Sequence, residues 1–419
     1  MTNYSPSKNK AILSLIVLIV FSCRTPELNN DTIATEIKTH INYLASDELE
    51  GRTFGSEGEQ KAAQYIADYF QALDLTPKGT DGYFQEFNVT PSGNPHEKPE
   101  IGGDTNDSSL VGRNVIGYLD NQAGKTVVIG AHFDHLGMGA IGSLHRGEEA
   151  IHNGADDNAS GTSVIMMMAK LLKNQVKNNN YLFIAFTGEE NGLWGSNHFT
   201  KNPTIDLTQV NYMLNFDMVG RLNEESTIAV HGTGTSPAWS EVLDLSNTDS
   251  LSLVKKESGV GPSDHTSFYL NDIPVLHFFT GQHDDYHRPS DDPEKINWEG
   301  IVRVVKYTQE LIINLDNKDK LVFTKTKNES ENTPRFKVGL GVVPDYLFDG
   351  EGMRIDGVSE DKPAQKAGLE KGDIVVQLGD STIIDMMSYM RALSVFEKGD
   401  TTKAMIKRGE EEIETEIVF

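Results

Sequence analysis

The 419-residue sequence contains a single cysteine, Cys23. One thiol excludes an intramolecular disulfide, and it also excludes a structural zinc site built only from thiolates. Positive charge is scarce as well, with 37 Lys and Arg against 62 Asp and Glu and a formal net charge of −25. A surface with this charge repels phosphate backbones and anionic headgroups, so we expect no nucleic-acid partner.

Long apolar runs are missing too, apart from residues 11–22 near the start of the chain. This run of about a dozen residues is short for a membrane span of ~20. Because Lys8 and Lys10 precede it, the run is typical of the core of a signal peptide.

Cys23 follows this run directly, and residues 20–23 (VFSC) resemble a bacterial lipobox, in which the cysteine is acylated after cleavage. We therefore predict a signal peptide over residues 1–23, lipidation at Cys23 and a polar tether over residues 24–31. The protein would then be an exported lipoprotein of the cell envelope, facing the periplasm or the surface and held to a membrane by its lipid. Plain secretion and an uncleaved anchor are the alternatives.

Strand-like and helix-like stretches alternate along most of the chain. Strands are expected at residues 114–119, 126–133, 181–188, 211–220 and 275–281, and helices at 33–52 with a break at Gly51, 60–73, 163–172, 193–199 and 302–315. This alternation predicts a largely parallel sheet between helix layers. The fold class expected for residues 32–317 is α/β, a three-layer sandwich with a central, mostly parallel mixed sheet.

The composition changes after this region. Residues 318–334 are mostly charged and polar and are expected to form a linker, with a possible short strand at 321–325. Residues 335–419 are expected to form a small β-rich domain, with strands at 336–342, 352–358, 373–380 and 404–409 and helices at 363–368 and 386–393.

Side chains that can bind metals gather in five segments, each expected to end a strand: residues 132–134, 156–157, 187–190, 215–217 and 285–287. Imidazoles and carboxylates are the nitrogen and oxygen ligands that zinc accepts. The adjacent Asp156 and Asp157 repel each other unless a cation offsets them. Taken singly, such residues usually belong to ordinary loops or solvated faces, so the ordered set indicates the metal site.

The tandem acids Glu189 and Glu190 fit a division of labour. One carboxylate would bind metal, while its neighbour would point the other way and hold a proton. A water molecule activated by a metal needs such a base.

This ordered set resembles the co-catalytic two-zinc aminopeptidases of clan MH, which include bacterial leucyl aminopeptidases, glutamate carboxypeptidase II and glutaminyl cyclases. The resemblance covers about residues 33–314 and implies the zinc aminopeptidase fold with two Zn²⁺ ions per chain. It implies five ligands, namely His132, Asp157, Glu190, Asp217 and His287. Asp157 would bridge the two ions, and its peptide bond to Asn158 would be cis. His132 and His287 would bind different ions.

The resemblance also implies roles for other residues of the site. Glu189 would be the general base, and Asp134 would accept the far N–H of the His132 ring. Tyr286 would donate to the oxyanion.

Two candidates for substrate contact are less sharply defined. Residues 261–265 match a family loop near the substrate pocket, which makes His265 a candidate, and Asp285, with its neighbour Asp284, is a candidate to receive a substrate ammonium. The remaining histidines, including His135, are expected to be structural.

The function expected is that of an exported zinc-dependent aminopeptidase, acting on peptides with a free N-terminus through a water bound by two zincs and a glutamate base. A glutaminyl cyclase with one zinc and a carboxypeptidase that holds an acidic substrate end with Arg are alternatives on the same fold. From another class, the chain could be a non-catalytic binding protein that carries a peptide-binding domain.

Residues 336–419 resemble a PDZ domain. Val338, Gly339, Leu340 and Gly341 correspond to the loop that receives a peptide carboxylate. Such domains bind an extended C-terminus by adding it as a strand to a sheet edge. The PDZ ligand would thus be a peptide C-terminus; alternatively, the domain only packs on the peptidase and shapes its access.

Overall fold

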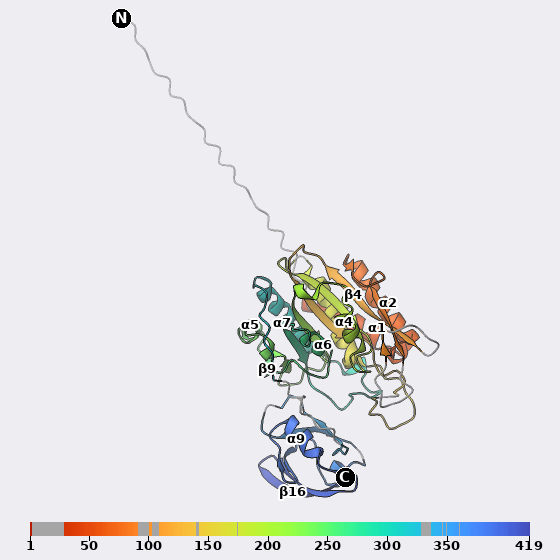
Figure 1. Cartoon of the computed structure of the whole chain (residues 1–419), viewed down its shortest axis with the longest axis vertical. Coiled ribbons are helices and arrows are strands. Elements are labelled where there is room, and N and C mark those ends of the chain that lie inside the picture. Colours follow the sequence, from red (N-terminus) through yellow and green to blue (C-terminus); the bar gives the residue numbers. More distant parts are fainter. Residues whose placement is uncertain are drawn as a thin grey trace.

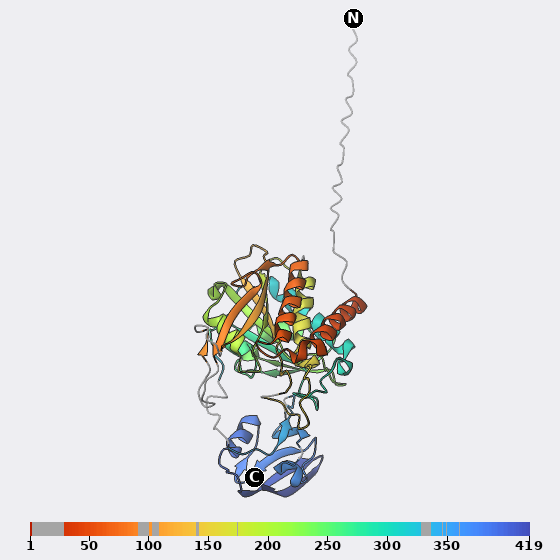
Figure 2. The same ribbon diagram turned by 90° about the vertical axis from the view of Figure 1, so that its right-hand side faces the viewer.

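A computed structural model describes Met1 and residues 29–90, 100–102, 109–139, 142–173, 175–327, 337–345, 347–348, 350–359 and 361–419. The predicted signal peptide apart from Met1, the lipidation site Cys23 and most of the tether lie outside these residues. Within the described part, every helix is too short or too polar to cross a membrane. The structure has two bodies, the larger one in colours from red to cyan and the smaller one drawn in blue (Figures 1 and 2).

The larger domain is built on a ten-stranded sheet whose strand order is β3-β2-β4-β6-β5-β7-β10-β8-β9, with β1 beside β4. The strands β6, β5, β7 and β10 run parallel to one another, whereas β2, β3 and β4 add antiparallel strands at one side. The bounds are β1 (Thr76–Pro77), β2 (Phe84–Thr90), β3 (Glu100–Ile101), β4 (Leu110–Leu119), β5 (Thr126–His132), β6 (Asn180–Phe186), β7 (Val210–Phe216), β8 (Thr227–His231), β9 (Ser252–Lys256) and β10 (Val275–Phe279).

Helices cover both faces of this sheet, so the central strands are buried throughout. Because side chains alternate along a strand, Val127 packs into the core on one face and Val128 into the core on the other. The helices are α1 (Asn30–Leu44), α2 (Glu57–Ala72), α3 (Gly161–Leu172), α4 (Trp194–Lys201), α5 (Trp239–Ser246), α6 (His265–Tyr269) and α7 (Trp298–Asp316). Side chains of α1, α2, α3, α5 and α7 join the first core, and those of α4 and α6 join the second. The expected three-layer α/β sandwich is confirmed.

The structure differs from the expected elements in a few places. The first helix ends at Leu44, and residues 47–52 form a separate short turn in which Glu50 and Gly51 adopt left-handed backbone angles. Strands β8 and β9 were not expected, because they are short and β9 is rich in lysine. The possible strand at 321–325 is wrong, since the N–H of Leu321 bonds to the Asn211 side chain instead of to a neighbouring strand.

The smaller domain has its own antiparallel sheet and its own hydrophobic core, separate from both cores of the larger domain. Its strands are β11 (Val342–Pro344), β12 (Met353–Val358), β13 (Ile374–Leu378), β14 (Ser381–Thr382), β15 (Thr401–Arg408) and β16 (Glu411–Val418), and its helices are α8 (Pro363–Lys366) and α9 (Met386–Leu393). The expected first strand at 336–342 begins only at Val342. The hairpin strand β16 was missed, because charged residues fill much of its sequence.

Candidate active site

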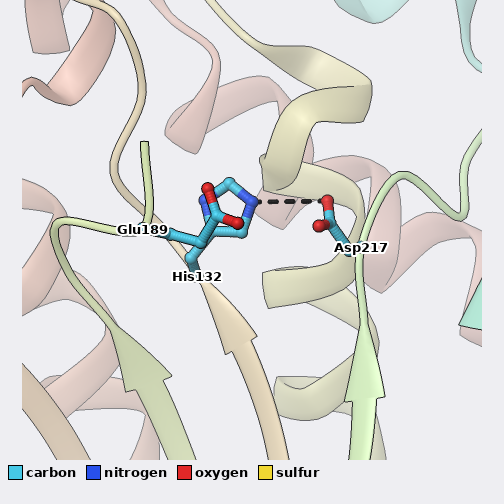
Figure 3. A group of neighbouring side chains, drawn as sticks. All are labelled: His132, Glu189 and Asp217. Atoms are coloured by element: carbon cyan, nitrogen blue, oxygen red, sulfur yellow. Dashed lines mark hydrogen bonds and ion pairs between the residues drawn. The ribbon is translucent and has the colours of Figure 1, made fainter. Parts of the chain in front are cut away.

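Three of the five predicted segments lie at the carboxyl edge of the sheet. His132 is the last residue of β5, Asp217 follows β7 directly, and Glu189 lies in the loop after β6 (Figure 3). Since these strands are parallel neighbours, their carboxyl ends meet at one edge, where α/β proteins place their sites.

The other two segments are not at strand ends, contrary to expectation. Asp157 lies in the turn Ala155–Ser160 that leads into α3, and its peptide bond to Asn158 is cis, as the family resemblance implies. The Asn158 side chain donates to the Phe216 carbonyl at 2.9 Å, which ties this turn to the end of β7. His287 lies in the long loop after β10, and its Nδ1 atom bonds to the Gly142 carbonyl at 2.9 Å. Long-range contacts therefore bring both segments to the same edge.

The two oxygens of Asp157 face two different imidazoles. Its Oδ1 atom lies 3.4 Å from Nε2 of His132, and its Oδ2 atom lies 3.2 Å from Nε2 of His287. His132 Nε2 is also 3.3 Å from Oδ1 of Asp217, and His287 Nε2 is 3.2 Å from Oε2 of Glu190. The five predicted ligands thus form two groups that share Asp157.

Zinc fits this set of donors. The described residues contain two groups whose potential ligand atoms all lie within 4.8 Å of one another, His132 with Glu189 and Asp217, and His135 with Asp157 and Glu190. Both groups are largely shielded from solvent and combine imidazole nitrogen with carboxylate oxygen, which zinc accepts. Buried carboxylates packed this closely repel one another unless a cation lies between them.

The pKa values of Glu189 and Glu190 are shifted in opposite directions. Burial raises the pKa of Glu189 well above its usual range, and the charge of His132 offsets this only in part. For Glu190, burial also acts to raise the pKa, but hydrogen bonds from His135 and His287 hold it well below its usual range. Adjacent carboxyls whose pKa values diverge are suited to different roles. Glu189 is the one suited to hold a proton.

Asp134 connects the loop of Glu189 to the first histidine. Its buried Oδ1 atom accepts the backbone N–H of Glu189 at 3.1 Å and lies 3.6 Å from Nδ1 of His132. The same Nδ1 atom is 3.2 Å from the Asp134 carbonyl oxygen. Asp134 therefore holds the ring of His132 with its Nε2 atom turned towards Asp157 and Asp217.

Sequence reasoning missed His135, which was assigned a structural role. Its Nδ1 atom lies 2.8 Å from Oε1 of Glu190, and its ring packs edge-on against that of His287 at 5.9 Å. The pairing of His132 with His135, both close to the end of β5, was the signal that could have shown it.

Two charged residues beneath the site were also missed. Asp291 is fully buried and accepts the backbone N–H groups of Asp156 and Asp157, each at 3.0 Å, which fixes the turn that carries the shared carboxylate. Asp291 follows no strand and belongs to no recognised motif, so nothing in the sequence marked it.

Arg52 is the second of these residues, and its side chain is fully buried. It donates to the backbone carbonyls of Phe133 at 2.7 Å, Asn153 at 2.6 Å and Gly154 at 3.2 Å, and also to that of Leu44. Burial lowers the pKa of Arg52 to about 10, and the charges of nearby carboxylates offset this lowering only in part. Arg52 thus remains a cation at neutral pH beneath an acidic site.

Gly51 allows Arg52 to reach this position. Its φ is +70°, and a Cβ atom here would lie 2.6 Å from the His152 carbonyl oxygen. Only glycine fits so close a backbone approach.

The predicted roles of Tyr286, His265 and Asp285 have different outcomes. Tyr286 lines the cavity in front of the site and stacks on the His287 ring at 3.8 Å, a position compatible with donating to substrate. His265 is fully buried, and its ring stacks behind His277, which lines the cavity in its place. A direct substrate contact by His265 is therefore not supported, because another imidazole covers it.

Asp285 is also unsuited to receive a substrate ammonium. It lies 2.6 Å from Arg221 and 3.3 Å from Lys295, and it accepts the Ser290 hydroxyl at 2.7 Å. These partners hold the pKa of Asp285 at about 2, although burial acts to raise it. Its charge is already balanced by two cations.

Comparison with known proteins identifies both domains. Residues 114–312 match the model of Peptidase family M28, and residues 316–418 match that of the PDZ domain. The chain therefore carries a peptidase family M28 domain followed by a PDZ domain, which confirms the resemblance expected from the sequence.

The relatives share this peptidase domain but not the whole chain. Aminopeptidase YwaD of Bacillus subtilis is 33% identical over 163 residues, which are 35% of this chain and 34% of that protein, so the chain spans about a third of its length. A zinc aminopeptidase from Bacillus subtilis superposes with a TM-score of 0.54 at 20% identity, covering 70% of this chain and 98% of that one. A glutaminyl cyclase from Bacteroides thetaiotaomicron superposes with a TM-score of 0.52 at 17% identity, covering 70% and 99%. The fold is thus common to two activities, and the site must distinguish them.

Proposed function

We propose that this chain is a zinc-dependent aminopeptidase with two zinc ions per chain, which hydrolyses the N-terminal residue from peptides. The observation that carries the proposal is the position of Asp157, whose two oxygens face the separate imidazoles of His132 and His287. A carboxylate shared in this way fits a bridge between two cations. Two-metal sites of aminopeptidases hold their ions ~3.5–4 Å apart.

The ligands would divide as the ion pairs suggest. His132 and Asp217 would hold one ion, His287 and Glu190 the other, and Asp157 both. When bound, zinc polarises the scissile carbonyl and lowers the pKa of a coordinated water towards ~7.

Glu189 accepts the proton of the attacking water and passes it to the leaving amine. Its carboxylate lies with His132 and Asp217, within 4.8 Å of both, which places it within reach of a water held at these ligands. Tyr286 lines the same cavity and would donate its hydroxyl to the oxyanion.

The charge distribution in the cavity favours an N-terminal ammonium over a C-terminal carboxylate near the metal ligands. The described residues that line the cavity include three cations, Lys255, Lys256 and Arg354. Lys255 and Arg354 are paired with Asp244 and Asp345 at 2.6 and 2.5 Å. No arginine of the peptidase domain is among the described lining residues, and this disfavours a carboxypeptidase.

A glutaminyl cyclase and a non-catalytic binding protein would differ from an aminopeptidase in metal content and in turnover. The cyclase would need one zinc, whereas the proposed ligands form two groups that share Asp157. The binding protein would not need Glu189 within reach of the ligands.

We further propose that the chain is exported and anchored to a membrane through Cys23. This rests on the sequence of residues 8–23 alone.

The test is to measure zinc per chain and turnover on aminoacyl amides, on their N-acetylated forms and on peptides with N-terminal glutamine. We expect two zinc ions, hydrolysis of free-amine substrates only, and loss of turnover with a chelator. One zinc with cyclisation of glutamine would indicate the cyclase, cleavage of N-blocked peptides at the C-terminus would indicate a carboxypeptidase, and bound zinc without turnover would indicate a binding protein.

A further inference from the structure

The cavity in front of the metal ligands is shared by both domains. It has a volume of about 670 Å³, within the range of ~300–1,000 Å³ typical of pockets for small ligands. His132, Glu189 and Tyr286 line it from the peptidase side. The PDZ side contributes three segments, the loop after β11, the beginning of β12 and the start of α9, with Asp345, Phe348, Arg354, Ile384, Asp385 and Met386 among the lining residues.

Contacts between the domains hold the PDZ domain against this cavity. The Nζ atom of Lys256, at the end of β9, donates to the Phe348 carbonyl at 3.4 Å. The Leu347 side chain packs on Gly281, where a Cβ atom would come within 2.8 Å of it. Gly281 lies in the loop after β10 that carries Tyr286 and His287, so the Leu347 contact falls on the loop that bears these residues. The smaller domain lies against the larger one (Figures 1 and 2).

Strand β11 lies at one end of the PDZ sheet and pairs with β12. Its other edge is where an extended peptide can add as a further strand. Val342 of β11 and Met386 and Met390 of α9 are half-buried and pack against the same core of the PDZ domain.

The chain direction of β11 determines the direction in which such a peptide runs. The loop Val338, Gly339, Leu340 and Gly341 precedes β11, and the cavity-lining residue Asp345 follows it. The carbonyls of Leu340 and Gly341 accept the N–H groups of Ala364 and Ser359, each at 2.8 Å, which fixes this loop. A peptide antiparallel to β11, with its carboxylate at the loop, directs its N-terminal part past Asp345 and into the cavity.

We propose that one substrate peptide is held by both domains at once, with its C-terminal carboxylate at residues 338–341 and its N-terminal residue at the metal ligands. This rests on the proposed aminopeptidase function and adds the substrate class: peptides with a free C-terminus that are long enough to span β11 and the cavity. Three residues lie alongside β11, over ~10 Å at ~3.3 Å per residue. With at least one more residue at the metal ligands, the threshold length is at least four residues.

The experiment uses the full zinc-loaded chain and peptides of two to ten residues that share one N-terminal residue, each as the free acid and as the C-terminal amide. The quantity measured is the ratio of kcat/KM for the acid to that for the amide. We expect this ratio to rise about tenfold or more between dipeptides and octapeptides, because hydrogen bonds to a charged group are worth ~1.5–3 kcal/mol. A ratio that stays constant with length overturns the proposal.

A charge placed in the loop tests the assignment of the carboxylate. At Gly339 a Cβ atom meets nothing closer than the Gly341 backbone nitrogen at 4.0 Å, so a side chain fits. Gly339→Glu should lower the octapeptide ratio about tenfold, to that of dipeptides, by repelling the carboxylate. Gly339→Gln adds a neutral side chain of the same size as Glu, so this variant should keep most of the octapeptide ratio. Gly124→Glu adds the same charge at a glycine with open space around it and should leave the ratio unchanged. Equal effects of the Glu and Gln variants at Gly339 overturn the proposal.

The dipeptide arm separates this inference from the proposed function. If no peptide releases its N-terminal residue in a zinc-dependent reaction, the proposed aminopeptidase function is refuted. Release from dipeptides, together with a ratio independent of length, refutes only the shared peptide and indicates that the PDZ domain serves a separate partner.

Discussion

The Asp134 carboxylate accepts the backbone N–H of Glu189 at 3.1 Å, so the loop that carries the proposed base is tied to the loop that follows the first ligand strand. Asp134 also lies 3.6 Å from the His132 ring. We expect Asp134→Asn to keep the hydrogen bond from Glu189 but to lose the charge that orients His132. Zinc affinity or kcat/KM should fall ~10–100-fold.

Zinc titration and steady-state kinetics on one aminoacyl amide check this prediction. Asp120→Asn is the matched control, since Asp120 is exposed and also accepts a backbone N–H, that of Gln122 at 2.8 Å. Equal behaviour of the two variants would contradict a role for the Asp134 charge.

The second prediction separates the adjacent acids. Glu189→Gln preserves size and removes basicity, so the variant should bind both zinc ions while kcat falls ~10²–10⁴-fold. Glu190→Gln changes a proposed ligand and should lower zinc occupancy along with rate. Metal analysis and kcat on both variants check this, and the reverse pattern would exchange the two roles.

Arg52 should be important for stability. Replacing it with Met leaves the carbonyls of Phe133 and Asn153 without the Arg52 donor and removes a buried cation among carboxylates. We expect a loss of ~3–5 kcal/mol in the free energy of unfolding. Arg303, which is half-buried and pairs with the exposed Asp249 and with the Ser226 hydroxyl, is the control, and its change to Met should cost less, about 1 kcal/mol. Denaturant unfolding measures both, and equal losses would contradict the argument.

Glu59 should make stability depend on pH. Burial raises its pKa to about 8, and the charge of Arg113, 3.7 Å away, offsets burial only in part. Because the pKa in the folded state lies above its unfolded value, the contribution of Glu59 is fully present below the unfolded pKa. It is lost as pH rises through about 8.

Glu59→Gln mimics the neutral acid and removes this dependence. The stability of the wild type minus that of the variant should therefore fall from pH 4 to pH 9, as measured by denaturant unfolding. A difference that is constant with pH would show that Glu59 is ionised in the folded protein.

The fifth prediction concerns the proposed lipid anchor. Cys23→Ala should release the protein from the membrane fraction while its turnover on aminoacyl amides stays within about twofold, because the cysteine precedes the peptidase domain and is not among the proposed ligands. Cell fractionation and an assay of the released protein check this. A variant that stays in the membrane would point to an uncleaved apolar anchor.

The local sequence pattern was enough to predict the central strands of the larger domain. Residues such as Val127, Val128 and Ile129 form a continuous apolar run, because β5 is buried on both faces. The edge strand β9 lacks such a run, since packing covers it less, and it could not be seen in the sequence. The same limit hid β16, where exposed Glu side chains alternate with the half-buried Ile413 and the buried Ile417.

The sequence by itself determined the fold class, because the apolar pattern of the strands is a local property, and it offered the side chains that are proposed as donors. His132, Glu189 and Asp217 could be expected together, since each lies at or just after the end of one of three neighbouring parallel strands. Tertiary structure alone decided that the two oxygens of Asp157 face different imidazoles, that Arg52 and Asp291 lie beneath them, and that Asp345 and Met386 line the cavity from the other domain. These relationships join residues far apart in the sequence, and a one-dimensional pattern carries no information on which of them meet.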